Sequence, residues 1–228
     1  MFYPHKIISI RENDRVLEIG PGDAPFHRSN VLLELNYANE EDRIKQFGHR
    51  NPLKSDKQLV FYDGKKFPFD DKAFDYVICS HVLEHVPEPR LFLEEMFRVA
   101  HRGYLEYPLL AYDYLYNFDV HLNFLKWNKG RLYHMKKSET GLNEFKPVQQ
   151  FFLRTLEHNY GDFLGKIPHC FFEGFEWEGS FQLISSSSLN DFVDPEADLR
   201  GPETQASPSV RSASKALLKA LKNKFKHV

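Results

Sequence analysis

A strand-like run that leads directly into a glycine-rich turn is the feature that most limits how this chain can fold. The run RVLEI, residues 15–19, is apolar enough for a buried strand, and Gly20-Pro21-Gly22 follows it at once. Closely spaced glycines let the backbone approach a ligand where a side chain would collide, and Glu18 can accept hydrogen bonds from an amine or another cation. A glycine-rich turn alone is a weak sign of a nucleotide-type site, so the rest of the pattern has to decide.

Four further strand-like runs follow the first one and alternate with helical or irregular stretches. They cover residues 31–35, 58–62, 74–80 and 103–108, and a helix is predicted from Pro89 to about His101 on an approximately helical apolar stripe. This alternation predicts an α/β fold, a Rossmann-like, doubly wound and mostly parallel sheet. Ligands of such sheets bind beyond the carboxyl ends of the strands, so functional residues are expected there.

Acidic residues stand at the ends of three of these strands. Besides Glu18, Glu34 lies near the end of the second run, where a carboxylate can accept hydrogen bonds from both hydroxyls of a ribose, and Asp63 ends the third run. Asp63 could accept from an adenine amino group, with Phe67 or Phe69 packing on the ring. Glu34 or Asp63 alone is better explained as a solvated loop residue, but the three acids together favour a nucleoside-containing ligand.

The motifs VLEIGPGDAP, VFYDGKKFPFDDKAFDYVICSHVLEHVPEP and RLFLEEMFRVAHRGYLEYP together resemble the class I S-adenosylmethionine-dependent methyltransferases, of the methyltransferase type 11-like kind. The resemblance covers roughly residues 14–108. It implies S-adenosyl-L-methionine as the cofactor and an enzyme that moves its methyl group by in-line displacement. A looser resemblance to a bacterial subgroup implies a small-molecule or glycan-type acceptor, with oxygen favoured over nitrogen.

The same resemblance implies roles for single residues. Those expected to bind the cofactor are Glu18, Gly20 and Gly22 around its methionine part, Glu34 at the ribose, Asp63 and Gly64 at the adenine, and Ser80 and His81 along the pocket. The subgroup adds His27 and Arg28 as contacts of the cofactor's carboxylate. Two departures stand out, because Ala24 replaces the usual third glycine and the connection from Gly22 to Val31 is too short for the usual first helix.

A general base is needed only where the acceptor must lose a proton, as a sugar or phenol hydroxyl does. The candidates are His81 and His121, although a structural role for His121 remains the alternative. Tyr107, Tyr112 and Tyr114 either line an acceptor pocket or pack in an aromatic-rich region.

The stretch CSHVLEHVPEP, residues 79–89, also matches H-x-x-E-H, a zinc-hydrolase pattern that would use His81, Glu84 and His85. Pro87 and Pro89 follow so closely that barely one helical turn is left to present both histidines, so no metal ligand is assigned. Glu84 and His85 are expected instead to fix a turn by hydrogen bonds. A further alternative is a non-catalytic cofactor-binding module of the same fold.

The domain expected from these patterns spans residues 1–184, with a cofactor-binding core at 14–108 and an acceptor-side insertion at about 109–165. Hairpins are predicted at 124–135, around Asn128-Lys129-Gly130, and at 171–184, and a helix is predicted at 148–164. Residues 185–214 are rich in Ser, Pro, Asp and Glu and predict a disordered linker. Residues 215–228 predict a basic amphipathic tail.

Charge is distributed unevenly along the chain. Residues 204–228 hold six Lys and Arg and no acid; because the net charge is −2, the rest of the chain carries −8. An acidic body argues against nucleic acid as a partner. The tail is interpreted as a solvated end or as a weak peripheral anchor to anionic membrane or protein. Nothing in the sequence sets the oligomeric state.

The expected compartment is the cytoplasm. Residues 1–14 lack the pattern of a secretory signal, no run reaches the roughly 18 apolar residues of a membrane span, and the two cysteines, Cys79 and Cys170, do not form a disulfide framework.

Overall fold

The computed structural model describes residues 1–47, 53, 55–156 and 162–193 of the 228-residue chain. Its main sheet has six strands in the order β3-β2-β1-β4-β5-β8. They are β1 (Val16–Ile19), β2 (Val31–Leu35), β3 (Gln58–Tyr62), β4 (Tyr76–Ser80), β5 (Arg102–Pro108) and β8 (Phe172–Glu178). The first five pair in parallel and β8 pairs antiparallel with β5. The predicted strands and the mostly parallel Rossmann-like sheet are therefore confirmed.

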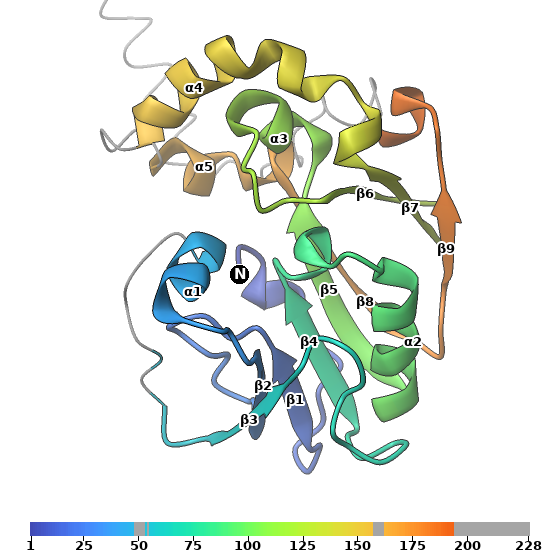
Figure 1. The fold of residues 1–228 in the computed structure, drawn as a ribbon. Coiled ribbons are helices and arrows are strands. Elements are labelled where there is room, and N and C mark those ends of the chain that lie inside the picture. The colour runs from blue at the N-terminus through green and yellow to red at the C-terminus, as the bar shows by residue number, and fades with distance from the viewer. Residues whose placement is uncertain (48–52, 54, 157–161, 194–228) are drawn as a thin grey trace, which may run out of the picture. The chain divides into compact units, whose positions relative to one another are not determined.

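Helix α2 (Pro89–Val99) covers one face of this sheet (Figure 1). Pro89 suits the first helical turn, where its missing N–H costs nothing, and Phe92, Met96 and Val99 recur at helical spacing and are buried against the strands. Full burial of each such side chain contributes about 1.5–3 kcal/mol. The packing of α2 thus holds the strands of the main sheet in place.

The opposite face is covered without a helix between β1 and β2. Residues 20–30, all of them described, form turns and loop, and the first helix, α1 (Glu40–Phe47), comes only after β2. Tyr3, beside the 3₁₀ turn η1 (Pro4–Lys6), packs there with Tyr76, Tyr104 and Phe172. The abbreviated first connection expected from the sequence is confirmed.

A second layer lies beyond the carboxyl ends of the parallel strands (Figure 1). Its sheet has the order β6-β7-β9, built from β6 (Asn123–Asn128), β7 (Arg131–Lys136) and β9 (Gln182–Ser185). Around it lie α3 (Leu110–Tyr116), α4 (Lys146–Thr155), α5 (Asp162–Lys166) and the 3₁₀ turns η3 (Lys137–Glu139), η4 (Leu142–Phe145), η6 (Pro168–Cys170) and η7 (Leu189–Phe192). The predicted hairpin at 124–135 is present: Lys129 and Gly130, both at positive φ, form the tight turn.

The hairpin predicted at 171–184 is wrong. β8 pairs with β5 of the main sheet, whereas β9 crosses to the second sheet and pairs in parallel with β7. The predicted helix at 148–164 is observed in part, since α4 begins at Lys146 and ends at Thr155, and residues 157–161 of that prediction lie outside the described residues.

The folded unit extends past the predicted domain end at residue 184. It runs to Val193, because η7 packs its Phe192, only 2% exposed, beside Phe124 and Leu110. The rest of the predicted linker and the basic tail, residues 194–228, lie outside the described residues. Over the described part of the chain, none of the helices has the length and apolar character needed to cross a membrane.

Candidate functional site

The glycine turn after β1 forms the floor of the site. Gly20 and Gly22 adopt φ of +61° and +63°, which side chains disfavour. A Cβ on Gly20 would lie 2.5 Å from Cγ2 of Val82, whereas one on Gly22 would project into open space. The turn is braced by Glu18, whose Oε2 accepts from Phe26 N at 2.8 Å and from Ser29 Oγ at 2.6 Å. Burial raises the pKa of Glu18, although both hydrogen bonds oppose that effect.

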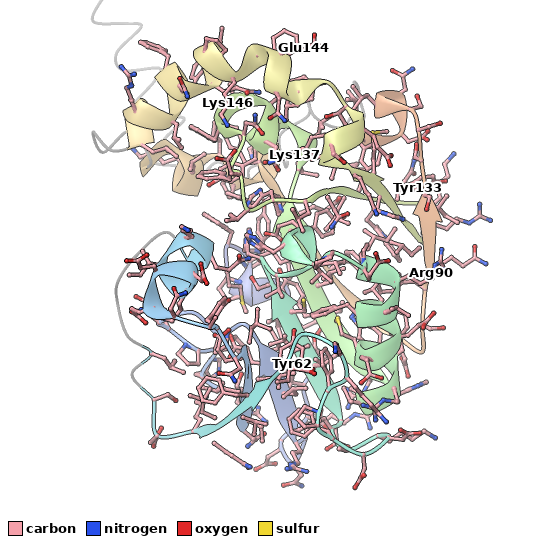
Figure 2. All side chains as sticks on the ribbon, viewed as in Figure 1. Tyr62, Arg90, Tyr133, Lys137, Glu144 and Lys146 are labelled. Atoms are coloured by element: carbon pink, nitrogen blue, oxygen red, sulfur yellow. The ribbon has the colours of Figure 1, made fainter. Side chains whose placement is uncertain are left out.

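A first cavity of about 270 Å³ opens at the ends of β1, β2 and β3. Its lining includes Gly20, Glu34, Leu35, Tyr37, Tyr62, Gly64, His81 and Phe92. Oε1 of Glu34 accepts from Leu35 N at 2.9 Å, and burial raises the pKa of Glu34 to about 7. Tyr62, at the end of β3 and labelled in Figure 2, is one of the lining residues.

Asp63 and the two predicted adenine-packing rings do not line this cavity. Asp63 is exposed, and its Oδ1 accepts from Lys65 N at 3.1 Å, which stabilises the turn after β3. Phe67 is 1% exposed and packs edge-on against Tyr62 and Phe92, inside the core. The aromatic walls of the first cavity are therefore Tyr37, Tyr62 and Phe92 rather than Phe67 and Phe69.

A second cavity, about 580 Å³, adjoins the first. The two share Gly20, Gln46, His81 and His85. The second is also lined by the turn residues 20–24, by Glu18, Ser80, Glu84 and His121, and by the rings of Tyr112, Phe118 and Phe172. Most sequence-predicted site residues thus meet at one edge of the sheet, as the carboxyl-end rule requires.

His81 occupies the junction of the two cavities. Its φ of +57° is costly for a side-chain-bearing residue, by roughly 1–2 kcal/mol, so its position is imposed by the surrounding structure. Nε2 lies 2.9 Å from Oε1 of Glu106, and Nδ1 lies 3.5 Å from Oε1 of Glu84. Burial lowers the pKa of His81, but the two carboxylates together outweigh it and raise that pKa. The two acids therefore favour the protonated form of the ring and hold it in place, an arrangement that suits positioning better than proton abstraction.

Glu106, at the end of β5, was missed in the sequence. It is fully buried and also accepts from Ser80 Oγ at 3.0 Å, Tyr104 Oη at 2.6 Å and the backbone N of Tyr3 at 2.9 Å. Burial works to raise its pKa, but His81 and these donors hold the pKa of Glu106 at about 2. Its signal was an acid inside the apolar run GYLEYP, the same pattern that identified Glu18 in the first strand.

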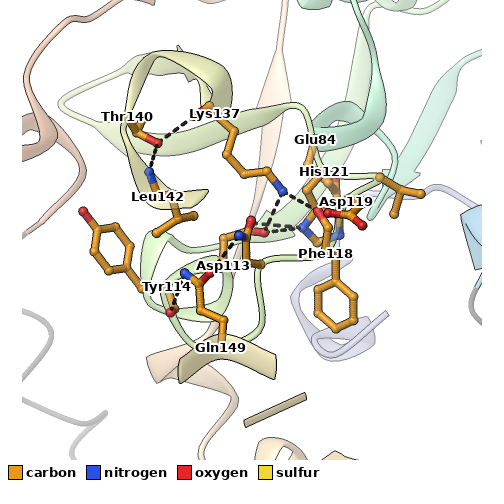
Figure 3. Close-up of polar contacts among 12 residues, drawn as sticks. Glu84, Asp113, Tyr114, Phe118, Asp119, His121, Lys137, Thr140, Leu142 and Gln149 are labelled. Carbon is orange, nitrogen blue, oxygen red and sulfur yellow. Dashed lines mark hydrogen bonds and ion pairs between the residues drawn. The ribbon is translucent and has the colours of Figure 1, made fainter. Parts of the chain in front are cut away.

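A second group of titratable side chains faces the second cavity, and we call Glu84, His85 and His121 the histidine–glutamate cluster. One potential ligand atom from each of the three lies within 4.8 Å of the others. Nδ1 of His85 contacts the carbonyl oxygen of Val120 at 3.0 Å, and Nδ1 of His121 contacts Asp113 Oδ2 at 3.0 Å. Figure 3 shows Asp113 between His121 and Lys137, whose Nζ lies 3.8 Å from Asp113 Oδ1.

Glu84 does not fix its turn through its side chain, as the sequence suggested. It is fully buried, and among the described residues neither carboxylate oxygen has a hydrogen-bond partner. Backbone carbonyls hold the turn in place instead. Leu122 N donates to the carbonyl of Glu84 at 2.7 Å, and Asn123 Nδ2 donates to the carbonyl of Val86 at 2.7 Å. These bonds bring the 3₁₀ turn η2 (Leu83–His85) against the loop that carries His121.

Two basic residues expected at the cofactor's carboxylate lie elsewhere. Arg28 donates through Nη2 to the carbonyls of Arg11 at 2.7 Å and Glu12 at 3.0 Å, so its guanidinium braces the N-terminal segment. The ring of His27 packs on Phe26. Neither residue is among those that line the two cavities, and the lysine that does line the second is Lys45, from α1.

The three tyrosines divide between the two expected roles. Tyr112 lines the second cavity. Tyr107 is fully buried, donates to Glu173 Oε2 at 2.7 Å and accepts from Trp127 N at 2.6 Å, so it joins the two sheets. Tyr114 is 39% exposed and outside the lining of the cavities described above.

The strand order, the antiparallel edge strand and the glycine turn flanked by strand-end acids define a class I methyltransferase fold. Sequence comparison agrees, since the methyltransferase domain model matches residues 17–105. Over this part of the chain, sequence and fold are similar to those of the class I S-adenosylmethionine-dependent methyltransferases. The match ends within β5, so the whole second layer, His121 included, lies outside it.

Among curated relatives, the chain is similar to the putative methyltransferase YrhH of Bacillus subtilis, with 30% identity over 40% of this chain and 54% of the relative. It is also similar to a phosphatidylethanolamine N-methyltransferase of Cereibacter sphaeroides, with 29% identity over 39% and 46%. The chain thus spans about half the length of the curated relatives it matches. A solved putative methyltransferase from Bacillus halodurans shares 22% identity over 46% of this chain and 49% of the other, with a TM-score of 0.33.

The residues at the first cavity fit the family's cofactor, S-adenosylmethionine. A largely buried carboxylate, Glu34, keeps acceptor capacity beyond its single bond to Leu35 N, as a ribose requires. In the adjoining second cavity, the space beside Gly22, which a Cβ would enter, leaves the backbone open to close approach.

Proposed function

We propose that this protein is an S-adenosylmethionine-dependent methyltransferase that methylates an oxygen of a small-molecule or glycan-type acceptor. The observation that carries the proposal is the pair of adjoining cavities, one with Glu34 at its wall and the other with the histidine–glutamate cluster, which meet at Gly20 and His81. This arrangement supplies a cofactor site and an acceptor site that share one boundary, as direct transfer between two bound molecules needs.

Bound S-adenosylmethionine supplies a methyl group that its positively charged sulfur already activates. The residues of this chain then have to bind, orient and exclude water. Glu34 would accept hydrogen bonds from the ribose, and the bare backbone of Gly20 and Gly22 would permit close approach. His81, fixed between Glu84 and Glu106, sets the wall between the two cavities.

Methylation of an oxygen also requires that a hydroxyl give up its proton. The histidine–glutamate cluster is the place where we expect this activation, because His121 uses Nδ1 on Asp113 and leaves Nε2 for the cavity. Tyr112, Phe118 and Phe172 surround the same space and provide apolar surface for the body of a small acceptor.

The size and setting of the second cavity support a small acceptor. At about 580 Å³ it lies in the range of small-molecule sites. The names of the relatives do not decide the acceptor, because they include both a phosphatidylethanolamine N-methyltransferase and a demethylmenaquinone methyltransferase. The choice of oxygen therefore rests on the subgroup resemblance and on His85 and His121 at the second cavity, which can take part in removing a proton from a hydroxyl.

The first test is cofactor binding by calorimetry with the wild-type chain, Glu34→Ala and the exposed control Glu94→Ala. We expect Glu34→Ala to weaken binding of S-adenosylmethionine at least tenfold, because a charge-assisted bond to the ribose is worth about 1.5–3 kcal/mol, and Glu94→Ala to leave it unchanged. Release of S-adenosylhomocysteine is then measured against a panel of phenols, hydroxy acids and sugars. A folded wild-type chain that binds no cofactor would contradict the proposal, and binding without turnover on any acceptor would favour a non-catalytic module.

A further inference from the structure

We propose that Glu84, His85 and His121 bind a divalent transition-metal ion, for which Zn²⁺ is the best chemical match, at the wall of the second cavity. Two imidazoles and one carboxylate form a common three-residue ligand set for zinc, with a further position left open. No metal ligand was assigned from the sequence, so this site departs from that expectation.

The geometry brings three suitable ligand atoms together. They lie within 4.8 Å of one another, and Nε2 of His85 is 3.8 Å from Oε1 of Glu84. Ligand atoms around a tetrahedral zinc ion, with bonds of about 2.1 Å, lie roughly 3.4 Å apart. Ligand atoms up to 4.8 Å apart would therefore have to approach one another by up to about 1.4 Å when the ion binds.

Both histidines are already oriented in the manner of metal ligands. A histidine that binds a metal through one nitrogen usually donates from the other to a carbonyl or carboxylate, which fixes its tautomer and ring plane. Here Nδ1 of His85 meets the carbonyl of Val120, and Nδ1 of His121 meets Asp113. Lys137 lies beside Asp113 on its other side, with Nζ 3.8 Å from Oδ1 (Figure 3).

Glu84 provides an independent sign that something is bound here. A fully buried carboxylate without hydrogen-bond donors is costly, and native structures rarely keep one without a partner. The nearest potential donor is Nδ1 of His81, at 3.5 Å from Oε1. A cation held between Glu84 and the two histidines would supply a closer partner than these long ion pairs with His81 and His85.

The site is not the H-x-x-E-H site of a zinc hydrolase. That pattern would use His81, whose Nε2 is 2.9 Å from Glu106 and whose segment forms only a three-residue 3₁₀ turn. His121 takes the third position instead, from the loop before β6, and brings its own supporting carboxylate.

Three protein ligands leave a coordination position that faces the second cavity. An acceptor hydroxyl bound there would be oriented, and the cation would lower its pKa so that the oxygen reacts after losing its proton to solvent. This role rests on the proposed methyl transfer, and it makes His121 a ligand rather than the group that removes the proton. The favoured acceptors are compounds whose hydroxyl can bind a cation.

The experiment begins with untagged full-length protein that has been stripped by a chelator. Zn²⁺ is titrated by calorimetry in the absence of cofactor, and Co²⁺ is added in parallel, because its visible absorption reports the number and geometry of its ligands. We expect one equivalent to bind with a Kd at or below about 1 µM. Wild-type protein that binds no more Zn²⁺ than the double variant His85→Gln/His121→Gln would overturn the site.

Single variants then test each ligand. Glu84→Gln, His85→Gln and His121→Gln are each expected to weaken Zn²⁺ binding at least 100-fold, and Asp113→Asn about 10- to 100-fold, since it acts through His121. The control is His101→Gln, an exposed histidine outside both cavities, which should bind like the wild type. Thermal melting identifies any variant that fails to fold. Glu84→Gln keeps the side-chain shape, so unchanged Zn²⁺ binding in that variant would count against the proposal.

Two further measurements separate this proposal from the methyl transfer. Asp113→Asn should bind S-adenosylmethionine as tightly as the wild type, because Asp113 lines neither cavity and contacts His121 rather than a residue of the first cavity. Metal binding without methyl transfer would leave the metal site standing and remove the proposed function. Methyl transfer that persists in chelator and in Glu84→Gln would remove the metal's role with the acceptor.

Discussion

Single residues at this site are tuned by burial and by their nearest charged neighbours. Glu34 and Glu106 are both largely buried strand-end acids, yet burial raises the pKa of Glu34 to about 7, while His81, Tyr104 and the backbone N of Phe2 hold that of Glu106 at about 2. The difference follows from partners, because Glu34 has a single backbone donor, Leu35 N. Glu106 is thus a fixed anion that orients His81. Glu34 still has acceptor capacity for a ligand.

The raised pKa of Glu34 predicts opposite effects of one substitution on stability and on binding. Since the folded pKa lies above the unfolded value of about 4.3, Glu34 stabilises the cofactor-free protein most at low pH, and this contribution is lost as pH rises through 7. At pH 8 Glu34→Gln should therefore raise the free energy of unfolding by on the order of 2 kcal/mol, with little effect at pH 5.

The same Glu34→Gln variant should bind S-adenosylmethionine more weakly than the wild type at pH 8, because a neutral amide is a poorer acceptor than a carboxylate. Urea unfolding at pH 5 and pH 8, with calorimetry at pH 8, measures both effects. If stability and affinity changed in the same direction, Glu34 would not be the buried ribose acceptor described here.

The cofactor side of the site could be predicted residue by residue, because its signals are local. A strand-end acid and the glycines after it are adjacent in sequence, and the fold brings the strand ends together. The histidine–glutamate cluster could not be predicted in this way. His121 meets Glu84 and His85 only through the bonds of Leu122 and Asn123 to the turn after β4, and no sequence spacing encodes that contact.

Secondary-structure elements show the same division between local and distant causes. The β6–β7 hairpin was predictable because its two turn residues, Lys129 and Gly130, take positive φ and set the strand pairing by themselves. The pairing of β8 was not, because it depends on fit to β5: Gly103 lies against Trp177, and Gly174 lies against Tyr104. A bulky neighbour on each strand is matched by a glycine on the other.

This fit predicts that Gly174→Ala is destabilising out of proportion to its size. A Cβ at position 174 would lie 2.2 Å from Oη of Tyr104, which donates to Glu106. The ring cannot move without giving up that buried bond, so we expect a loss of about 2–3 kcal/mol in the free energy of unfolding.

The matched control for Gly174→Ala is Gly165→Ala in α5, where a Cβ would meet nothing within 4 Å. That change should stabilise the protein by about 0.5–1 kcal/mol, since alanine favours the helix. Urea unfolding compares the two variants. Adding Tyr104→Phe to Gly174→Ala should recover part of the loss by removing the colliding oxygen, and equal stability of the two glycine variants would contradict the β5–β8 fit.

At the scale of the whole molecule, the part of the chain that matches the family is followed by a second layer that lies outside the match. The family match ends at residue 105, and everything that closes the second cavity from above, including α3 and the loop with His121, comes after it. In the proposed function, the core binds the cofactor that the family shares, and the added layer selects the acceptor. This is why the cofactor could be inferred from the sequence and the acceptor could not.

The end of the folded unit gives the last prediction. Residues 185–193 resemble a linker in composition, yet Phe192 is 2% exposed beside Phe124, and Ser185 Oγ lies 2.8 Å from Nε2 of His134. A chain of residues 1–193 should therefore keep the melting temperature and cofactor affinity of the full chain. A chain of residues 1–184 should lose about 3–5 kcal/mol of stability, the usual cost of removing a buried phenylalanine side chain.

Thermal and urea unfolding of the two truncated chains, beside full-length Phe192→Ala, measure this difference. Phe192→Ala should reproduce most of the loss seen in residues 1–184, because the ring fills a cluster with Leu110 and Phe124 under the second sheet. That cluster lies on the α3 side of the molecule, so its loss should loosen the second cavity before the first. We therefore expect Phe192→Ala to weaken Zn²⁺ binding more than cofactor binding. Equal stability of the two truncated chains would place the end of the domain at residue 184.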